Sequence, residues 1–395
     1  MSTNLVEAAS AASDHCVRTA YADAQRQEAF LPTACVQNHA ANLHCLANGD
    51  LLCVWFGGTQ EGIPDVSIYL SRLAAGASAW SAPQKLSDDP TRSEQNPVLF
   101  TAPDGRLWLI YTAQLSGHQN TAIVRRRVST DGGVTWGPVE TLFDRPGTFV
   151  RQPIIALDSG TWLCPVFLCR TAPGERWVGN DDVSAVMVSD DQGASWALHE
   201  VPDSVGCVHM NIHVLHDGSL LALYRSRWAD FVYASRSTDG RTWSAPEPTD
   251  VPNNNSSIQF TVLRNGHLAL VFNESDASHG SERRASLYDD IEDSEDSGEL
   301  RDQKASARGS AVWGAPRAPM SLAISEDGGR TWRRRRNLEI GDGYCMTNNS
   351  ADRRNREYSY PSIVQSQDGA LHIAYTWFRQ KIKYVRVDEA WVRGR

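Results

Sequence analysis

Short runs in which apolar residues alternate with polar ones, or follow one another, recur along the chain, each directly after a turn glycine. The glycines are Gly49, Gly105, Gly160, Gly218, Gly266 and Gly369. A short apolar or alternating run after a turn residue predicts a β-strand. The glycines are 56, 55, 58, 48 and 103 residues apart. Steps of nearly equal size predict four-stranded units, and the double step predicts one further unit that carries an insertion.

A second repeat, Ser-x-Asp-x-Gly-x-Thr/Ser-Trp, is typical of a hairpin turn. It begins at Ser129, Ser189 and Ser325, a copy one residue shorter begins at Ser237, and Ser71–Trp80 resembles a degraded copy. Its Asp and Ser side chains bond the backbone of their own turn, Gly adopts a positive φ, and Trp packs the turn onto its sheet. The two repeats together predict an all-β fold, a six-bladed β-propeller of four-stranded antiparallel blades.

One segment interrupts the repeats. From about residue 275 to 312 the chain is rich in Glu, Asp, Ser and Arg, a composition too polar to bury a core, and we expect a mobile loop over one face. Residues 5–30 are polar, with a helix as one interpretation. We therefore predict an N-terminal segment, 1–30, and one propeller domain, 31–395, with an acidic insertion at about 275–312.

Charge and composition narrow the choice of partners. The 395 residues include 38 Lys and Arg against 47 Asp and Glu, a net charge of −9. Nucleic-acid binding depends on concentrated basic residues, so we expect no nucleic-acid partner. Residues 1–12 lack a signal-peptide pattern and no apolar run is long enough to span a membrane, so we expect a cytoplasmic protein without a membrane partner.

The repeats and the segment Glu357-Tyr358-Ser359-Tyr360-Pro361-Ser362 together resemble the sialidase (neuraminidase) superfamily. Two stretches, 38–40 and 55–66, are more specifically similar to a bacterial and plant branch of BNR (Asp-box) repeat proteins that is called sialidase-like. The resemblance covers residues 31–387. It implies an enzyme that acts on an acidic glycan without a cofactor.

Sialidases, as a family, hold the substrate carboxylate with three arginines and use a Tyr nucleophile paired with a Glu. Counting from the turns, the resemblance implies Arg225, seven residues after Gly218, and Arg317, eight residues before Ser325, as two of the arginines. It implies Tyr360, nine residues before Gly369, as the nucleophile.

If the count from the turn glycine is wrong by two residues, Tyr358 stands at the nucleophile's position. This chain departs from the family at two positions. Asn38-His39-Ala40 stands where the first arginine is expected, and His209 stands where the Glu is expected.

The remaining candidates for catalysis are His39, His209, Asp65 and Glu61. A histidine exchanges protons near neutral pH, and either acid on the Gly-Gly-Thr-Gln-Glu-Gly loop could protonate a leaving group. The alternative for each histidine is a hydrogen-bonded interior residue. His39, His209 and Asp65 could instead bind a metal, but their spacing matches no metal motif and we expect none.

Arg227, Glu357 and Asn254 are further candidates for contacts with the sugar, and Arg151 is another arginine that could contribute. Arginine is suited to a planar carboxylate because its guanidinium donates two parallel hydrogen bonds. The alternative is that Arg225 and Arg317 pair with carboxylates of the protein, and that Tyr360 is a core aromatic.

Three functions remain open. The first is an exo-glycosidase that cleaves a terminal acidic sugar, either sialic acid-like or a uronate. The second is a lyase that cleaves next to a uronate by β-elimination, with a His/Tyr pair moving the proton. The third is a non-catalytic glycan-binding propeller. The family resemblance favours hydrolysis, and the sequence leaves the oligomeric state open.

Overall fold

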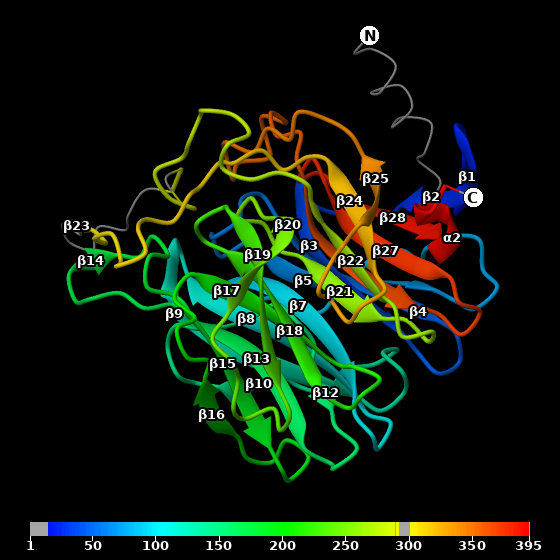
Figure 1. The fold of residues 1–395 in the computed structure, drawn as a ribbon, viewed down its shortest axis with the longest axis horizontal. Helices are drawn as coiled ribbons and strands as arrows, with labels where there is room; N and C mark the ends of the chain where they lie inside the picture. Colours follow the sequence, from blue (N-terminus) through cyan, green and yellow to red (C-terminus); the bar gives the residue numbers. More distant parts are fainter. Residues whose placement is uncertain (1–14, 289, 292–300, 395) are drawn as a thin grey trace.

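The computed structural model describes residues 15–288, 290–291 and 301–394, and most of its regular structure is β-strand (Figure 1). Six antiparallel sheets follow one another along the chain as the blades of a β-propeller, which confirms the predicted fold. Contacts between neighbouring blades close a ring, because β3 packs against β7, β7 against β11, β13 against β17, β17 against β21, β21 against β26, and β26 against β3.

Blades 1 to 3 contain the following strands. Blade 1 has β3 (Gln37–Cys45), β4 (Leu51–Gly58), β5 (Ser67–Leu73) and β6 (Gln84–Lys85). Blade 2 has β7 (Ser93–Thr101), β8 (Leu107–Leu115), β9 (His118–Ser129) and β10 (Glu140–Phe143). Blade 3 has an innermost strand in two pieces, β11 (Thr148–Val150) and β12 (Ile155–Ala156), then β13 (Trp162–Leu168), β15 (Val183–Ser189) and β16 (Ala197–Glu200).

Blades 4 to 6 complete the ring. Blade 4 has β17 (Cys207–Val214), β18 (Leu220–Ser226), β19 (Phe231–Ser237) and β20 (Glu247–Pro252). Blade 5 has β21 (Gln259–Val262), β22 (Leu268–Asn273), β24 (Met320–Ser325) and β25 (Arg334–Glu339). Blade 6 has β26 (Tyr358–Gln365), β27 (Leu371–Trp377), β28 (Lys381–Val387), β2 (Asp23–Phe30) and β1 (Arg18–Ala20).

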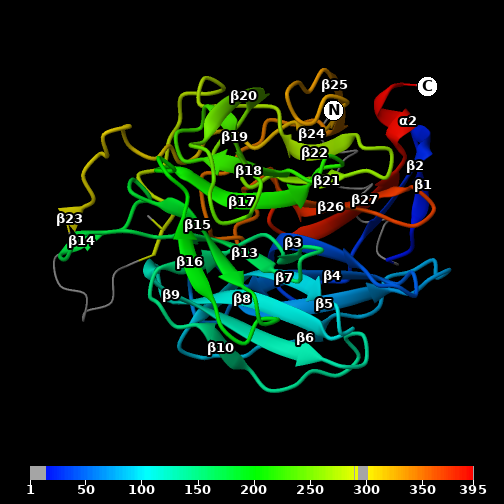
Figure 2. The ribbon, with the colours of Figure 1, turned by 60° about the horizontal axis from the view of Figure 1, so that its bottom comes forward.

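The two ends of the described chain meet in blade 6, where β2 pairs antiparallel with β28 (Figures 1 and 2). The helix considered for residues 5–30 is therefore wrong for Arg18–Ala20 and Asp23–Phe30, and residues 5–14 lie outside the described chain. A strand wins over a helix here because β28 offers β2 a full set of backbone partners. Helix α2 (Glu389–Val392) follows β28, and its buried Trp391 donates from Nε1 to Asp23 at 2.6 Å.

The Asp-box turns lie between the third and fourth strands of their blades, and their side chains bond the turn as expected. In the first copy, Ser129 Oγ accepts from the backbone N–H of Gly133 at 2.8 Å, and Asp131 accepts from that of Thr135 at 2.9 Å. These turns are part of the scaffold. They lie at the ends of the outer strands, away from the innermost strands that line the centre of the ring.

The insertion leaves blade 5 between β22 and β24. Its strand β23 (Arg301–Asp302) pairs in parallel with β14 (Glu175–Arg176) at the edge of the molecule opposite α2 (Figures 1 and 2). The expectation that this segment buries no core is wrong for Leu287 and Tyr288, which pack in one cluster with Phe167 of blade 3. No helix among the described residues is long and apolar enough to cross a membrane.

Candidate functional site

Four of the innermost strands have a bulge at the position nine residues before the turn glycine of their blade. Ala40, Asn96, His209 and Tyr360 occupy it in four blades, with φ values of 60°, 51°, 56° and 51°, and the strand register shifts there. A bulge redirects a side chain, and a left-handed backbone at a residue other than glycine is strained. Counting nine residues back from the turn glycine therefore reaches the same position in these blades, and His209 and Tyr360 occupy that position.

Tyr360 is the centre of a buried cluster at this level. Its ring lies 4.3 Å from the His39 ring and 5.6 Å from the His209 ring, measured between centroids. Its hydroxyl accepts a hydrogen bond from Arg225 Nη1 at 2.6 Å. Strands of three blades thus bring together the two histidines, the tyrosine and one arginine that the sequence predicts as site residues.

Three arginines surround the Tyr360 ring. The guanidinium carbons of Arg151, Arg225 and Arg317 lie 5.4, 5.6 and 5.6 Å from its centroid. Arg225 is held in place by Asn255, whose Oδ1 accepts from Arg225 Nε at 2.7 Å. The two predicted clamp arginines, Arg225 and Arg317, therefore face the same tyrosine.

Glu357 organises the arginines on the other side of the cluster. Its Oε1 accepts from Arg317 Nη1 at 3.3 Å and from Arg379 Nε at 3.1 Å, and Arg379 also pairs with Glu61. Burial raises the pKa of Glu357, but the Arg379 and Arg317 guanidiniums outweigh burial and hold the pKa below its usual range. Ser359 Oγ donates a further bond to Oε1 at 2.6 Å. Glu357 is therefore a buried carboxylate that positions two arginines.

Arg227 lies beside Arg225 but has its own partner. Asp182 Oδ2 accepts from Arg227 Nε at 3.0 Å and from Nη2 at 2.6 Å, and Trp177 Nε1 donates to Asp182 Oδ1 at 2.8 Å. The Trp313 ring lies 5.1 Å from the Arg227 guanidinium and 5.7 Å from that of Arg225. Arg227 thus supports Trp313 beside the site, and its charge is balanced.

The cluster holds more positive than negative charge. Its arginines are 151, 225, 227, 317 and 379, and its carboxylates are Asp182, Glu357 and Glu61. Among the described residues, Arg151 and Arg225 have no carboxylate partner. Burial lowers the pKa of Arg151 to about 10, and burial with the charges of Arg227 and Arg317 lowers the pKa of Arg225 to about 9, against the opposing effect of Tyr360. An anionic ligand would remove this imbalance.

Several polar atoms of the cluster are buried without a hydrogen-bond partner in the described protein. They are His39 Nε2, His209 Nδ1, Arg225 Nη2, Glu357 Oε2, and Nε and Nη1 of Arg151. Buried polar groups are nearly always paired, and leaving one unpaired costs about 1–3 kcal/mol. Such a concentration of unpaired atoms, mostly able to donate, is suited to an oxygen-rich anionic ligand.

The insertion and its flank lie against this cluster. Asn255 Nδ2 donates to the Val312 carbonyl at 2.8 Å, and the Val312 N–H donates to the Arg227 carbonyl at 2.7 Å. Tyr288 accepts from Gln119 Nε2 at 3.1 Å on the blade 2 side. Tyr360, at the centre of the cluster, is only 4% exposed.

Three predicted residues lie outside the cluster. Asp65 is exposed and accepts from the backbone and the hydroxyl of Thr59, at 3.0 and 2.6 Å. Tyr358 packs in the blade core and donates to the Ile340 carbonyl at 3.3 Å. Asn254 holds the flank of the insertion, because its Nδ2 donates to the Pro316 carbonyl at 2.7 Å.

The metal alternative, His39 and His209 with Asp65, is not brought together, since Asp65 faces solvent. Within residues 15–288, 290–291 and 301–394, no group of three or more His, Cys, Asp or Glu side chains is placed to hold a metal ion.

Sequence reasoning missed Arg379 and also Thr376, whose hydroxyl oxygen on β27 lies 2.8 Å from His39 Nδ1. Arg379 lies in the turn between β27 and β28, outside the register that is counted from the turn glycines, and no signal in the sequence marked it. Arg151 had a signal, because it is nine residues before Gly160, the same spacing as Tyr360 from Gly369.

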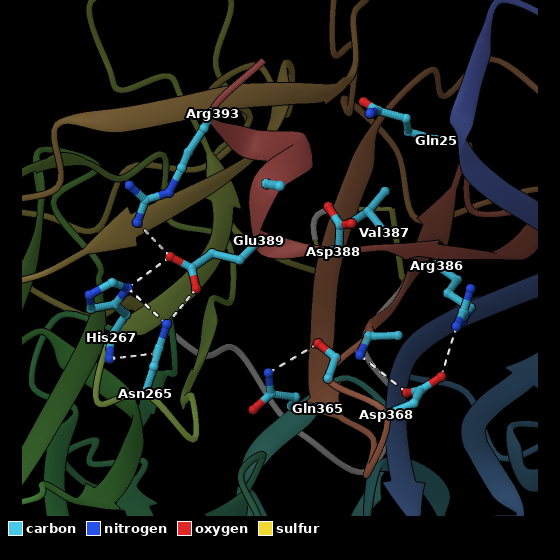
Figure 3. Close-up of a pocket in the computed structure, with 13 residues that line it drawn as sticks. Gln25, Asn265, His267, Gln365, Asp368, Arg386, Val387, Asp388, Glu389 and Arg393 are labelled. Atoms are coloured by element: carbon cyan, nitrogen blue, oxygen red, sulfur yellow. Dashed lines mark hydrogen bonds and ion pairs between the residues drawn. The ribbon is translucent and has the colours of Figure 1, made fainter. Parts of the chain in front are cut away.

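A polar cleft with a volume of about 650 Å³ lies elsewhere, between blades 5 and 6 and α2 (Figure 3). There Glu389 accepts from His267 Nδ1, Asn265 Nδ2 and Arg393 Nη2, each at 2.7 Å. The cleft is next to Gly369, at the opposite end of β26 from Tyr360. These side chains satisfy one another and fasten α2 to blade 5.

Comparisons with known proteins agree with this architecture. The model of a family described as BNR repeat-like domain matches residues 49–373. No curated protein matches the sequence. A Hadza microbial sialidase has a TM-score of 0.68 at 13% identity, over 92% of this chain and 68% of its own. A protein of unknown function from Dyadobacter fermentans has a TM-score of 0.65 at 15% identity, over 94% and 98%. The intramolecular trans-sialidase from Ruminococcus gnavus has a TM-score of 0.59 at 14% identity, over 89% and 94%.

Proposed function

Because the chain belongs to the BNR repeat-like domain family and has a sialidase-like fold, we propose that it is an enzyme that cleaves a terminal acidic sugar, sialic acid-like or a uronate, from a glycan by hydrolysis. The observation that carries the proposal is the buried Tyr360 hydroxyl at 2.6 Å from Arg225, inside a cluster with more arginines than carboxylates. The arginines would attract the sugar's carboxylate, and Tyr360 is a nucleophile within reach of the bound ring.

In the proposed reaction, Arg225 and Arg317 bind the substrate carboxylate. The Tyr360 oxygen attacks the anomeric carbon, the bond from that carbon to the glycosidic oxygen breaks, and the departing oxygen takes a proton. His209 is the group that receives the Tyr360 proton. Water then cleaves the sugar from Tyr360: its oxygen bonds to the anomeric carbon as the bond to the Tyr360 oxygen breaks, one water proton restores the acid that protonated the departing oxygen, and His209 returns the proton to Tyr360.

Of the two predicted acids, Glu61 joins the cluster through its ion pair with Arg379 and Asp65 does not, so we assign Glu61 as the donor to the departing oxygen, a role that requires it to take up a proton when the substrate carboxylate binds the arginines.

Elimination is the second candidate, and one observation favours it. Among the described residues, no carboxylate contacts the Tyr360 hydroxyl, and two histidine rings lie against the Tyr360 ring. Burial, with the nearby arginine charges, lowers the pKa of His209 well below its usual range, so the ring is neutral, and a bound carboxylate that offsets those charges would make protonation of the ring less unfavourable. In a uronate that carries a further sugar on O4, removal of the C5 proton, next to the carboxylate, would break the bond from C4 to the glycosidic oxygen and leave a double bond between C4 and C5, and the departing oxygen would take its proton from Tyr360.

The test is incubation with 3′-sialyllactose, with an oligosaccharide that has an unsubstituted glucuronic acid at its non-reducing end, and with one in which a further sugar is attached to O4 of the glucuronic acid. Release of the free acidic sugar supports hydrolysis, whereas ultraviolet absorbance from an unsaturated uronate supports elimination. Tyr360→Phe should abolish turnover, and Tyr358→Phe, which alters a tyrosine of the same strand outside the cluster, should retain it. Binding of these sugars without turnover would instead support a non-catalytic glycan-binding propeller and contradict the proposed activity.

A further inference from the structure

His39 has one ring nitrogen that is paired and one that is not. It lies on β3 with no exposed surface, and its Nδ1 is 2.8 Å from the Thr376 hydroxyl oxygen on β27. Its Nε2, at the other side of the ring, is buried without a partner in the described protein. Whether the unpaired Nε2 donates or accepts a hydrogen bond therefore depends on which ring nitrogen carries the proton.

The hydrogen bonds of Thr376 indicate which ring nitrogen of His39 carries the proton. Its hydroxyl oxygen accepts the backbone N–H of Ala40 at 3.1 Å. Among the described residues, His39 Nδ1 is the one acceptor within hydrogen-bond distance of its hydroxyl hydrogen. If His39 carried its proton on Nδ1 instead, the Thr376 hydrogen would be buried without an acceptor, and such a loss is unfavourable. The pairing therefore favours a bare Nδ1 and a protonated Nε2.

The doubly protonated imidazolium is disfavoured by its surroundings. Burial is the largest cause that lowers the pKa of His39, and the charges of Arg379, Arg317, Arg151 and Arg225 add to it, so that the pKa lies well below its usual range. No carboxylate contacts the His39 ring within the described residues. His39 is thus a neutral side chain between cationic ones.

We propose that Thr376 fixes His39 as the imidazole with its proton on Nε2, and that this N–H donates a hydrogen bond to the anionic group of the acidic sugar. This inference rests on the proposed function for the identity of the ligand. Tyr360 lies against the same ring at 4.3 Å, so a group bound beside Tyr360 is within reach of His39. His39 then determines specificity as a directed, uncharged donor beside Arg225, and it is not the base. Thr376 is its positioning residue.

The first measurement is independent of turnover. Nitrogen-15 NMR of histidine-labelled protein distinguishes the two neutral tautomers and the imidazolium, and His39 is assigned by the loss of its signals in His39→Gln. We expect the Nε2–H form in the wild type and in Thr376→Ser, which keeps the hydroxyl. Thr376→Val, which removes the hydroxyl, should shift the population towards Nδ1–H. A wild-type Nδ1–H or imidazolium form would overturn the proposal.

The second measurement tests donation to the ligand. Addition of N-acetylneuraminic acid or glucuronic acid should shift the Nε2 proton of the wild type, because it gains an acceptor. His39→Gln can present an amide N–H near the Nε2 position, whereas the shorter His39→Asn presents one near Nδ1. We expect a KM within about 10-fold of the wild type for His39→Gln and about 10- to 150-fold higher for His39→Asn, with a smaller change in kcat. Thermal melts show that each variant is folded.

The outcomes separate the two proposals. Turnover of an acidic sugar with equal KM for His39→Gln and His39→Asn would overturn the role of His39 and leave the proposed function standing. An Nε2–H tautomer without binding or turnover of either acidic sugar would overturn the proposed function, and with it the donation to substrate.

Discussion

Asp182 and Arg227 form a one-to-one ion pair beside the site, and Asp182→Asn measures its contribution to stability. The two bonds from Arg227 to Asp182 Oδ2 are 3.0 and 2.6 Å long, and the two side chains are 1% and 0% exposed. Asparagine keeps the shape and can still accept a bond, but it removes the charge. Arg227 would then be a buried cation without an anionic partner.

The size of the effect follows from this burial. Removal of one partner of a buried ion pair costs about 3–5 kcal/mol. The entropy of unfolding is about 2.1 cal/mol/K per residue, which for 395 residues is roughly 0.8 kcal/mol/K. The ratio predicts that Asp182→Asn lowers Tm by about 4–6 °C.

Calorimetric melts of the variant and two controls test this value. Asp104→Asn removes the partner of Arg106 from a pair of similar length, 2.6 Å, in which the side chains are 44% and 37% exposed, and Tm should change by no more than about 1 °C. Asp182→Asn combined with Arg227→Met removes both charges and should recover most of the loss. The reasoning is refuted if Asp182→Asn has the same Tm as the surface control Asp104→Asn, or if the double variant has a lower Tm than Asp182→Asn alone.

Three further predictions concern the site and its scaffold. Arg225→Met should weaken binding of an acidic sugar by about 10- to 150-fold, because one charge-assisted contact is lost, while a neutral sugar measured by the same calorimetric titration should bind unchanged. Glu357 has a folded-state pKa below its ordinary value of 4.5, so its stabilisation is complete above pH 4.5 and is lost as the pH falls through the folded-state value. Urea unfolding should therefore show the wild type more stable than Glu357→Gln at pH 7, with a gap that narrows on acidification below pH 4.5; a constant gap contradicts this. Asp327→Ala removes the acceptor of the Ser325 and Thr331 hydroxyls in an Asp-box and should lower Tm by about 1–3 °C without changing KM, and a changed KM would contradict a purely structural role.

The repeated elements of the fold were predictable because their signals are local. A turn glycine followed by an apolar strand, and an Asp-box that bonds its own backbone, both arise within a few residues. The N-terminal strand was not predictable in this way. Residues 23–30 are polar and only partly buried, and they become a strand because β28 offers them an unpaired edge. That partner is more than 350 residues away in the sequence.

Some residues of the candidate site were likewise predictable from local spacing, and others were not. Tyr360 and His209 were found by register because both occupy the bulge of an innermost strand, nine residues before a turn glycine. Tyr358, two residues away, faces the blade core, so a slip of the register would have exchanged a site residue for a packing residue. The spacing carries this information because the bulge recurs at the same distance from the turn.

Arg379 and Thr376 could not be found by counting residues from the turn glycines. Both belong to the segment from β27 into its following turn, and both matter through partners on other blades: Arg379 through Glu61, and Thr376 through His39. The resemblance to sialidases places the first clamp arginine on blade 1, where this chain has His39, and from the sequence alone this position lacks a cation. In the structure, Arg379 brings a guanidinium to Glu357 from blade 6. A buried carboxylate such as Glu357 needs cationic partners, and Arg379 supplies one from a turn whose position cannot be counted from the turn glycines.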